Sequence, residues 1–193
     1  AQVLAASTYP SEVVEADRWL QKNSNLKGEQ LATQVDKQSW DPSVKALTQF
    51  PSVLANMDKN LSWTSALGDA YFNNEQDVMN AVQVLRKRAQ VAGTLKTTAQ
   101  QKVNTEGETI IIEPANPQVV YVPAYNPWIV YGAPLAVYPG YVYVGGPWIA
   151  TPGIWFDAGF PVFWGFDFVW GWHAWRCDWH HRFVVFNHNR FVS

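Results

Sequence analysis

The chain has 193 residues, a length that suits one large domain or one domain with a long appendage. Its formal net charge is −2, and this near-balance argues against a nucleic-acid partner. Cys177 is the one cysteine in the sequence, which excludes a disulfide within the chain.

Aromatic and charged residues are segregated along the chain. Of the 29 aromatic residues, 22 fall within residues 115–193, whereas only six of the 30 charged residues do. This change in composition predicts an α+β protein in two parts. We expect a bundle of short helices over residues 1–105, followed by an aromatic, Gly/Pro-rich β or extended region over residues 106–193.

Proline and glycine mark where the expected helices begin and end. Pro10 suits a first helical position, and an apolar stripe follows it before the break at 23–25. That stripe comprises Val13, Ala16, Trp19 and Leu20. A second helix follows Gly28. Asp41 can cap a helix that begins at Pro42, and Pro51 restarts the helical pattern after Phe50.

The strongest helical pattern covers residues 75–91. Asn74 can cap this helix and Gly93 can end it, and the basic run at 86–88 is interpreted as a solvated last turn. Its buried stripe is predicted to comprise Val78, Ala81, Val82 and Leu85. Residues 94–108 are predicted to form a polar connector.

From Thr109 the pattern changes to β-branched and aromatic runs. Residues 109–112 and 118–122 are predicted strands, and 114–117 is the turn between them. Although residues 114–156 carry no formal charge, their many prolines exclude a membrane-spanning helix.

The extended pieces of the aromatic half lack the alternation of apolar and polar residues that a one-sided sheet requires. Each buried aromatic ring removes roughly 150–250 Å² from water, so the 22 rings amount to on the order of 4,000 Å². We expect other copies, another protein or lipid to cover part of this surface, although the segment could also fold into a tight sheet of its own. The predicted assembly residues are Tyr121, Tyr125, Trp128, Tyr131, Tyr138, Tyr141, Tyr143, Trp148, Trp155, Trp164, Trp170 and Trp172.

A cluster of metal-binding residue types lies near the end of the chain. His173, Cys177, His180 and His181 offer imidazole and thiol ligands that suit zinc or copper. Their spacing matches no established metal motif, and surface histidines beside one thiol are the favoured explanation. We therefore expect no cofactor, with a zinc or copper site as the alternative.

The motifs of catalysis are missing from the sequence. It has no nucleophile elbow, phosphate-binding loop or zinc-protease helix motif. Asp157 and Asp167 are isolated carboxylates beside glycines, where turn residues are common. We therefore expect no enzymatic activity.

Nine segments carry a family resemblance: Leu4–Pro10, Glu12–Trp19, Trp40–Leu47, Phe50–Leu54, Trp63–Asp69, Arg86–Gln90, Gln100–Val103, Ile111–Pro123 and Tyr125–Pro127. They resemble a bacterial family of unknown function, family 3300. The resemblance covers roughly residues 1–132. It implies a Gram-negative protein that is exported or lipid-anchored, in the periplasm, in the outer membrane or outside the cell. It also implies a leader and a further segment before Ala1, and it brings no catalytic residue.

The composition, with the location that the resemblance implies, leaves three functional hypotheses. The first is a structural envelope or extracellular protein that forms a homo-oligomer or polymer by strand addition and aromatic packing. The second is a binding protein whose aromatic tail contacts an outer-membrane partner or lipid. The third is a metal-binding protein that uses the His/Cys cluster.

Overall fold

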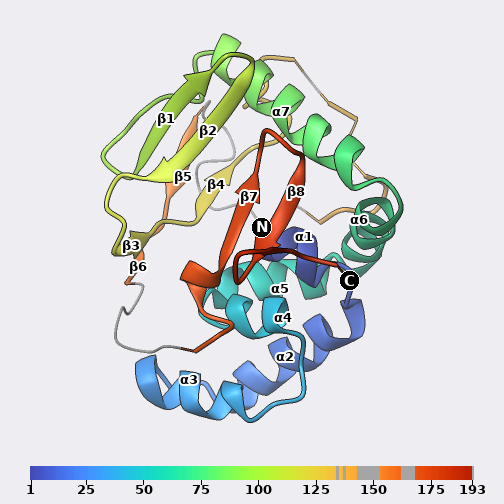
Figure 1. Cartoon of the computed structure of the whole chain (residues 1–193), viewed down its shortest axis with the longest axis vertical. Coiled ribbons are helices and arrows are strands. Elements are labelled where there is room, and N and C mark those ends of the chain that lie inside the picture. Colours follow the sequence, from blue (N-terminus) through green and yellow to red (C-terminus); the bar gives the residue numbers. More distant parts are fainter. Residues whose placement is uncertain (134, 137, 143–152, 162–167, 193) are drawn as a thin grey trace. The chain divides into compact units, whose positions relative to one another are not determined.

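The structure is a computed structural model that describes residues 1–133, 135–136, 138–142, 153–161 and 168–192. Its first compact unit consists of Ala1–Gln76 with Phe163–Ser193, and its second of Asp77–Val162. Helices dominate the N-terminal half and small antiparallel sheets the C-terminal half, which confirms the α+β fold class (Figure 1). The division at residue 105 was predicted from composition and stays a prediction, while the compact units group the last aromatic segment with the helices.

The first unit begins with six helices. They are α1 (Gln2–Ala6), α2 (Pro10–Lys22), α3 (Gly28–Asp36), α4 (Pro42–Leu47), α5 (Pro51–Lys59) and α6 (Leu61–Asn73). Proline occupies the first position of three of them, α2, α4 and α5, as the sequence predicts. The Asp41 carboxylate caps α4 by accepting a 2.8 Å hydrogen bond from the Ser43 N–H.

The core of the first unit lies between α2, α4 and α5. The predicted stripe of α2 is confirmed, since Val13, Ala16 and Leu20 are buried there and Trp19 packs at the edge. These residues contact the buried Val44, Leu47, Leu54 and Met57. Helix α6 crosses α1 closely at Gly68, because a β-carbon at that position would lie 2.0 Å from the Ser7 carbonyl oxygen.

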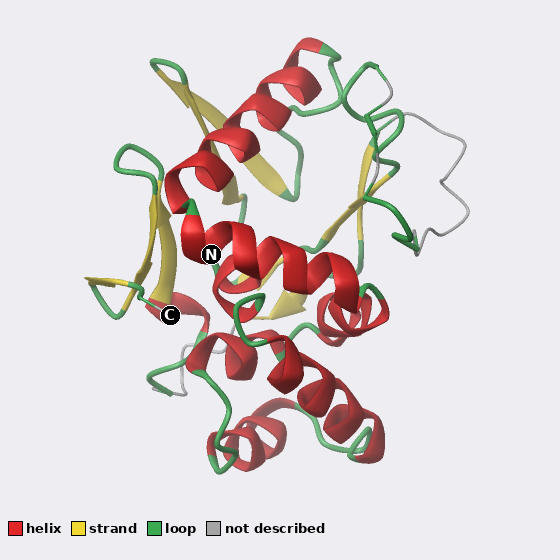
Figure 2. Ribbon diagram, turned by 90° about the vertical axis from the view of Figure 1, so that its right-hand side faces the viewer, coloured by secondary structure: helices red, strands yellow, loops and turns green. Residues whose placement is uncertain are grey.

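The first unit also contains a three-stranded antiparallel sheet, whose strands are among those drawn yellow in Figure 2. A short 3₁₀ helix, η2 (Trp172–Ala174), leads into β7 (Trp175–Asp178), β8 (Phe183–Phe186) and β9 (Asn189–Arg190). The two-residue loop between β8 and β9 has positive φ at both positions, as a type I′ hairpin turn requires. The consecutive residues Val184 and Val185 are both buried, so the chain itself covers both faces of β8.

Helix α7 (Glu75–Val91) has the predicted bounds but not the predicted buried stripe. Its buried residues are Met79, Gln83 and Ala89, whereas Ala81 is exposed. The side chain of Gln83 is buried because it pairs with one peptide group of the next hairpin. It accepts a 2.9 Å hydrogen bond from the Ile110 N–H and donates one of 3.2 Å to the Ile110 carbonyl.

The second unit contains a hairpin that the sequence revealed only in part. Strand β2 (Thr109–Pro114) is confirmed, but the predicted connector 94–108 is wrong because it contains β1 (Gln101–Glu106). The two strands pair antiparallel across a turn at Gly107, where φ is +59°. Strand β1 is polar and mostly exposed, so no hydrophobic pattern identifies it.

A second pair of segments forms what we call the aromatic ribbon, residues 119–125 and 154–161. In it β3 (Val119–Val120) pairs with β6 (Phe160–Pro161), and β4 (Pro123–Tyr125) pairs with β5 (Ile154–Phe156). Between these two pairings one side of the ribbon has two residues and the other has three. The ribbon therefore contains a bulge at residues 157–159.

Candidate functional site

The bulge gives the aromatic ribbon its shape. The Asp157 carboxylate accepts hydrogen bonds from the Gly159 N–H at 3.1 Å and from the Val122 N–H at 3.3 Å. Gly159 has a φ of +81°, and a β-carbon there would lie 2.6 Å from the ring of Tyr121. Glycine at this position therefore permits both the turn and the close approach of Tyr121, whose ring meets Phe156 edge-on at 6.4 Å. Asp157 thus shapes the backbone, as the sequence-based turn interpretation holds.

Three of the predicted assembly residues are exposed in the second unit. Trp128, Tyr138 and Trp155 have exposed fractions of 40%, 37% and 44%. Trp155 lies on β5, opposite Ala124 of the paired strand. An exposed tryptophan offers a large apolar surface that a partner can cover.

The other described tyrosines of this set are half-buried in the second unit. They are Tyr121, Tyr125, Tyr131 and Tyr141. The rings of Tyr125 and Tyr131 meet edge-on at 6.1 Å, and the Tyr131 hydroxyl donates a 3.4 Å hydrogen bond to that of Tyr125. Burial, followed by the neighbouring Tyr125, raises the pKa of Tyr131. Three further predicted residues, Tyr143, Trp148 and Trp164, lie outside the described residues.

The ribbon strands pair only with each other in the part of the chain that the structure describes. Most side chains along them are neither fully buried nor fully exposed, with Val120 as a buried exception. Pro123 and Pro161 remove one backbone donor from each side of the ribbon. A further strand can therefore hydrogen-bond to the ribbon only along stretches that avoid these two prolines.

Two predicted assembly residues, Trp170 and Trp172, instead contact the helices of the first unit. Trp170 was predicted at an interface, but it is 2% exposed and lies in the core of its own unit. Its indole N–H donates a 2.8 Å hydrogen bond to the Asp36 carboxylate. Trp172 is half-buried and packs edge-on against Phe50, with ring centroids 5.4 Å apart.

The four predicted metal ligands are distributed along η2, β7 and the turn after it. His173 is exposed on η2, Cys177 is half-buried on β7, and His180 and His181 are exposed in the turn. The Asp178 carboxylate accepts a hydrogen bond from the His181 backbone N–H and lies 2.9 Å from the His181 ring nitrogen. These two interactions with His181 lower the pKa of Asp178. No group of three or more His, Cys, Asp or Glu residues within the described ranges is arranged to hold a metal ion.

A buried carboxylate was not found from the sequence. Asp17 lies on the core face of α2, where Gln21 donates a 2.6 Å hydrogen bond to it. Burial raises the pKa of Asp17, and the charge of the neighbouring Asp58 raises it further. The sequence signal for this buried carboxylate is an acidic residue on the otherwise apolar face of α2.

We expect Asp17→Asn to stabilise the first unit at neutral pH. The raised pKa means that the folded chain holds this proton more tightly than the unfolded chain. The wild-type chain therefore loses stability as pH rises above about 4, the ordinary aspartate value. The asparagine variant should lack this loss, so its advantage in urea unfolding should appear between about pH 4 and 7 and vanish near about pH 3. The same substitution at the exposed Asp69 is the control, and an equal effect there would contradict the assignment.

The family described as "Protein of unknown function (DUF3300)" matches residues 1–193. The chain belongs to this family. The DUF3300 chain is 40% identical to "Uncharacterized protein YacH" of Escherichia coli (strain K12), over 68% of its own length. It spans 27% of the length of that relative. No solved structure matches.

The DUF3300 match extends the resemblance seen at residues 1–132 to the whole chain, including the aromatic segments. The family description names no reaction, ligand or compartment. None of the helices in the described ranges is long and apolar enough to cross a membrane.

Proposed function

We propose that this DUF3300 chain is a non-enzymatic structural protein of the cell envelope or the cell exterior. The aromatic ribbon and its neighbouring rings would mediate self-assembly by strand addition and aromatic packing. The proposal of export rests on the family resemblance, and the proposal of assembly rests on the geometry of the second unit.

The observation that carries this proposal is the incomplete cover of the ribbon. One face of the ribbon packs on the second unit through Ile154, which contacts the core of Ala89, Leu95 and Ile110, but its outer edges pair with no further strand among the described residues. Trp155 of the ribbon keeps 44% of its surface exposed, and Trp128 and Tyr138, which lie elsewhere in the second unit, keep 40% and 37%. Indole rings at the centre of an interface commonly contribute much of its binding energy.

Pro123 and Pro161 restrict where a strand of a second chain can hydrogen-bond to the ribbon. Each side of the ribbon carries one proline, which limits uncontrolled pairing along the whole edge. A neighbouring strand would therefore form a short ladder beside residues such as Ala124 or Trp155, and its side chains would cover the exposed rings. This arrangement favours one register over continuous aggregation.

We expect Trp155→Ser to weaken assembly. Loss of a ring at an interface centre commonly costs more than about 1 kcal/mol, so the concentration needed for assembly should rise at least about fivefold. Sedimentation velocity across a concentration series measures this change. Phe72→Ser is the matched control, because Phe72 is 65% exposed on α6 and outside the ribbon.

The same samples separate the alternative functions. Equal assembly of the two variants and the wild-type chain would contradict the role of the ribbon. A wild-type chain that stays monomeric but co-floats with lipid vesicles, and loses flotation on Trp155→Ser, would favour docking to a membrane over self-assembly.

A further inference from the structure

We propose that Tyr125 and Tyr131 form a site of oxidative modification, at which a one-electron oxidant joins their two rings as an intrachain dityrosine. The proposed self-assembly does not require this bond, and the bond does not require a second copy. The inference therefore goes beyond the proposed function and is tested separately from it.

The two phenol groups already meet in the folded chain. The hydroxyl oxygens of Tyr125 and Tyr131 lie 3.4 Å apart, and the ring centroids lie 6.1 Å apart at an interplanar angle of 77°. In a tyrosine ring the two ortho carbons are bonded to the carbon that carries the hydroxyl. Contact between the hydroxyls therefore also brings ortho carbons of the two rings near each other, and these are the atoms that couple in dityrosine.

A turn of the backbone holds the pair together. The carbonyl of Asn126 accepts hydrogen bonds from the Ile129 N–H at 3.1 Å and from the Val130 N–H at 3.0 Å. The side chain of Asn126, which is itself buried, accepts a 2.9 Å hydrogen bond from the Trp128 N–H. The folded turn thus keeps the two reacting groups in contact, which favours their reaction with each other over reaction with more distant groups.

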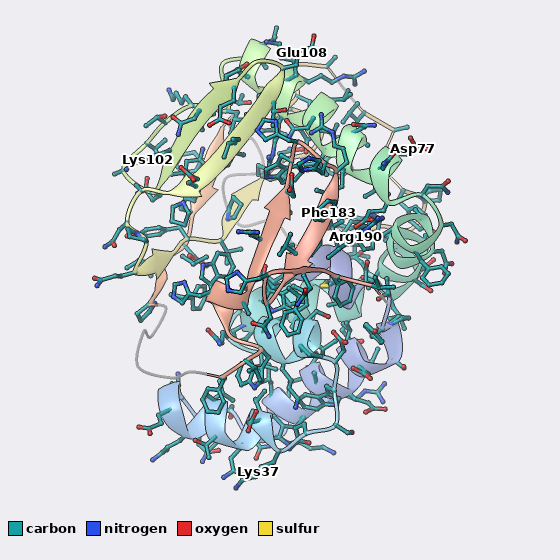
Figure 3. All side chains as sticks on the ribbon, in the orientation of Figure 1. Lys37, Asp77, Lys102, Glu108, Phe183 and Arg190 are labelled. Atoms are coloured by element: carbon teal, nitrogen blue, oxygen red, sulfur yellow. The ribbon has the colours of Figure 1, made fainter. Side chains whose placement is uncertain are left out.

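Packing outside the turn also fixes the two tyrosines. Tyr125 is the last residue of β4 and pairs with Ile154 of β5. Tyr131 and Ile154 both pack against the core that contains Ile110. Ile110 belongs to the β1–β2 hairpin, on which Figure 3 labels Lys102. The positions of both rings are therefore set by the fold of the second unit.

The exposure of the rings favours coupling within one chain. Tyr125 and Tyr131 are both half-buried, so a small oxidant can reach them. A tyrosine of another chain would first have to displace the contact between the two hydroxyls. The partner phenol within the chain is already in place.

The coupling step removes two hydrogen atoms in total. Burial raises the pKa of Tyr131, so its phenol keeps its proton at neutral pH, and oxidation must remove a proton together with the electron. Each phenol loses its O–H hydrogen as one electron and one proton, and the two phenoxyl radicals join through one ortho carbon each. The two hydrogens on the joined carbons then move to the oxygens, which restores both phenols. With persulfate as the oxidant, the two electrons convert one persulfate ion to two sulfate ions, and the two protons go to water.

The new carbon–carbon bond would attach the aromatic ribbon to the core of the second unit. It would join the last residue of β4 to a ring that packs on that core. Opening of the ribbon would then be restricted by a covalent link, as a disulfide restricts the segments that it joins. Amide hydrogen exchange of β4 should therefore be slower after oxidation than before it.

The test oxidises the full chain in dilute solution with persulfate, activated by visible light through a ruthenium complex. Dityrosine fluorescence measures the yield, and mass spectrometry of peptic peptides locates each bond. We expect the bond between residues 125 and 131 to be the most abundant dityrosine, with a yield that does not depend on protein concentration. Dityrosine only at other positions, or none at all, would overturn the proposal. A chain that stays monomeric still permits the expected result, so failure of self-assembly leaves this test unaffected.

Variants that keep the ring but remove one hydroxyl give the second test. Tyr125→Phe and Tyr131→Phe should each lose most of the dityrosine fluorescence, because phenylalanine forms no phenoxyl radical. Tyr121→Phe is the matched control, since Tyr121 is also half-buried in the ribbon but meets the ring of Phe156. Its yield should equal that of the wild-type chain, and an equal loss in all three variants would overturn the assignment. If Tyr131→Phe fails to fold by circular dichroism, the peptide map of the wild-type chain decides.

Discussion

Gly68→Ala is expected to lower the free energy of unfolding by about 3 kcal/mol, the upper end of the usual cost of overpacking a core. The new β-carbon would lie 2.0 Å from the carbonyl oxygen of Ser7 and 2.6 Å from its carbonyl carbon. Both are backbone atoms, so no side chain can rotate to make room. Helices α1 and α6 would have to separate, which would open the core between them. Urea unfolding followed by far-ultraviolet circular dichroism measures the loss.

Ala70→Ser is the control for Gly68, because Ala70 is exposed on the same helix. It should change the stability by less than about 0.5 kcal/mol, as substitutions at exposed positions usually do. A Gly68→Ala variant as stable as this control would contradict the close crossing of α1 and α6.

Trp170→Ala is expected to cost about 3–5 kcal/mol, the range for removing a buried tryptophan. The variant loses the buried ring, its stacking on Phe168 and the hydrogen bond to Asp36. The C-terminal sheet should then detach from the helices before they unfold. Amide hydrogen exchange of β8 should rise with the fall in stability.

Substitutions of Asp36 separate the hydrogen bond from the ring. Asp36→Asn keeps an oxygen that accepts from the Trp170 indole, so its cost should be small. Asp36→Ala leaves a buried N–H without an acceptor and should cost about 1–3 kcal/mol. Equal stability of the two variants would show that the 2.8 Å contact contributes nothing.

Local chemistry in the sequence predicted where most helices begin. Pro10, Pro42 and Pro51 each open a helix because proline fixes φ and needs no donor in the first turn. The bounds of α7 also followed from local signals. Its buried face did not, because Gln83 enters the core through its two hydrogen bonds with Ile110, 27 residues away. A hydrophobic pattern cannot find a polar residue that is buried by a distant peptide group.

The sequence predicted which aromatic rings belong to the candidate site, but it did not predict that some of them are exposed and others buried. The sequence treats Trp155 and Trp170 alike, since both lie in the same aromatic stretch with few charges. The structure exposes Trp155 and buries Trp170 against Asp36. This difference depends on a contact across 134 residues, and neither propensity nor periodicity encodes such contacts.

The part of the aromatic surface that the chain covers itself is larger than composition suggested. Trp170, Trp175 and Val184 are buried in the first unit, so the last segment is already packed in a single chain. Among the described residues, the exposed rings of the predicted assembly set are Trp128, Tyr138 and Trp155, all in the second unit, and Trp155 lies on the ribbon. The expectation of outside cover therefore applies to the ribbon rather than to the last segment.

The most direct test is the mass of the wild-type chain by multi-angle light scattering, at tens of micromolar and without detergent or lipid. We predict species heavier than one chain, in proportions that rise with concentration. A single monomer mass across the whole series would show that the ribbon needs no second copy, and it would contradict the proposed self-assembly.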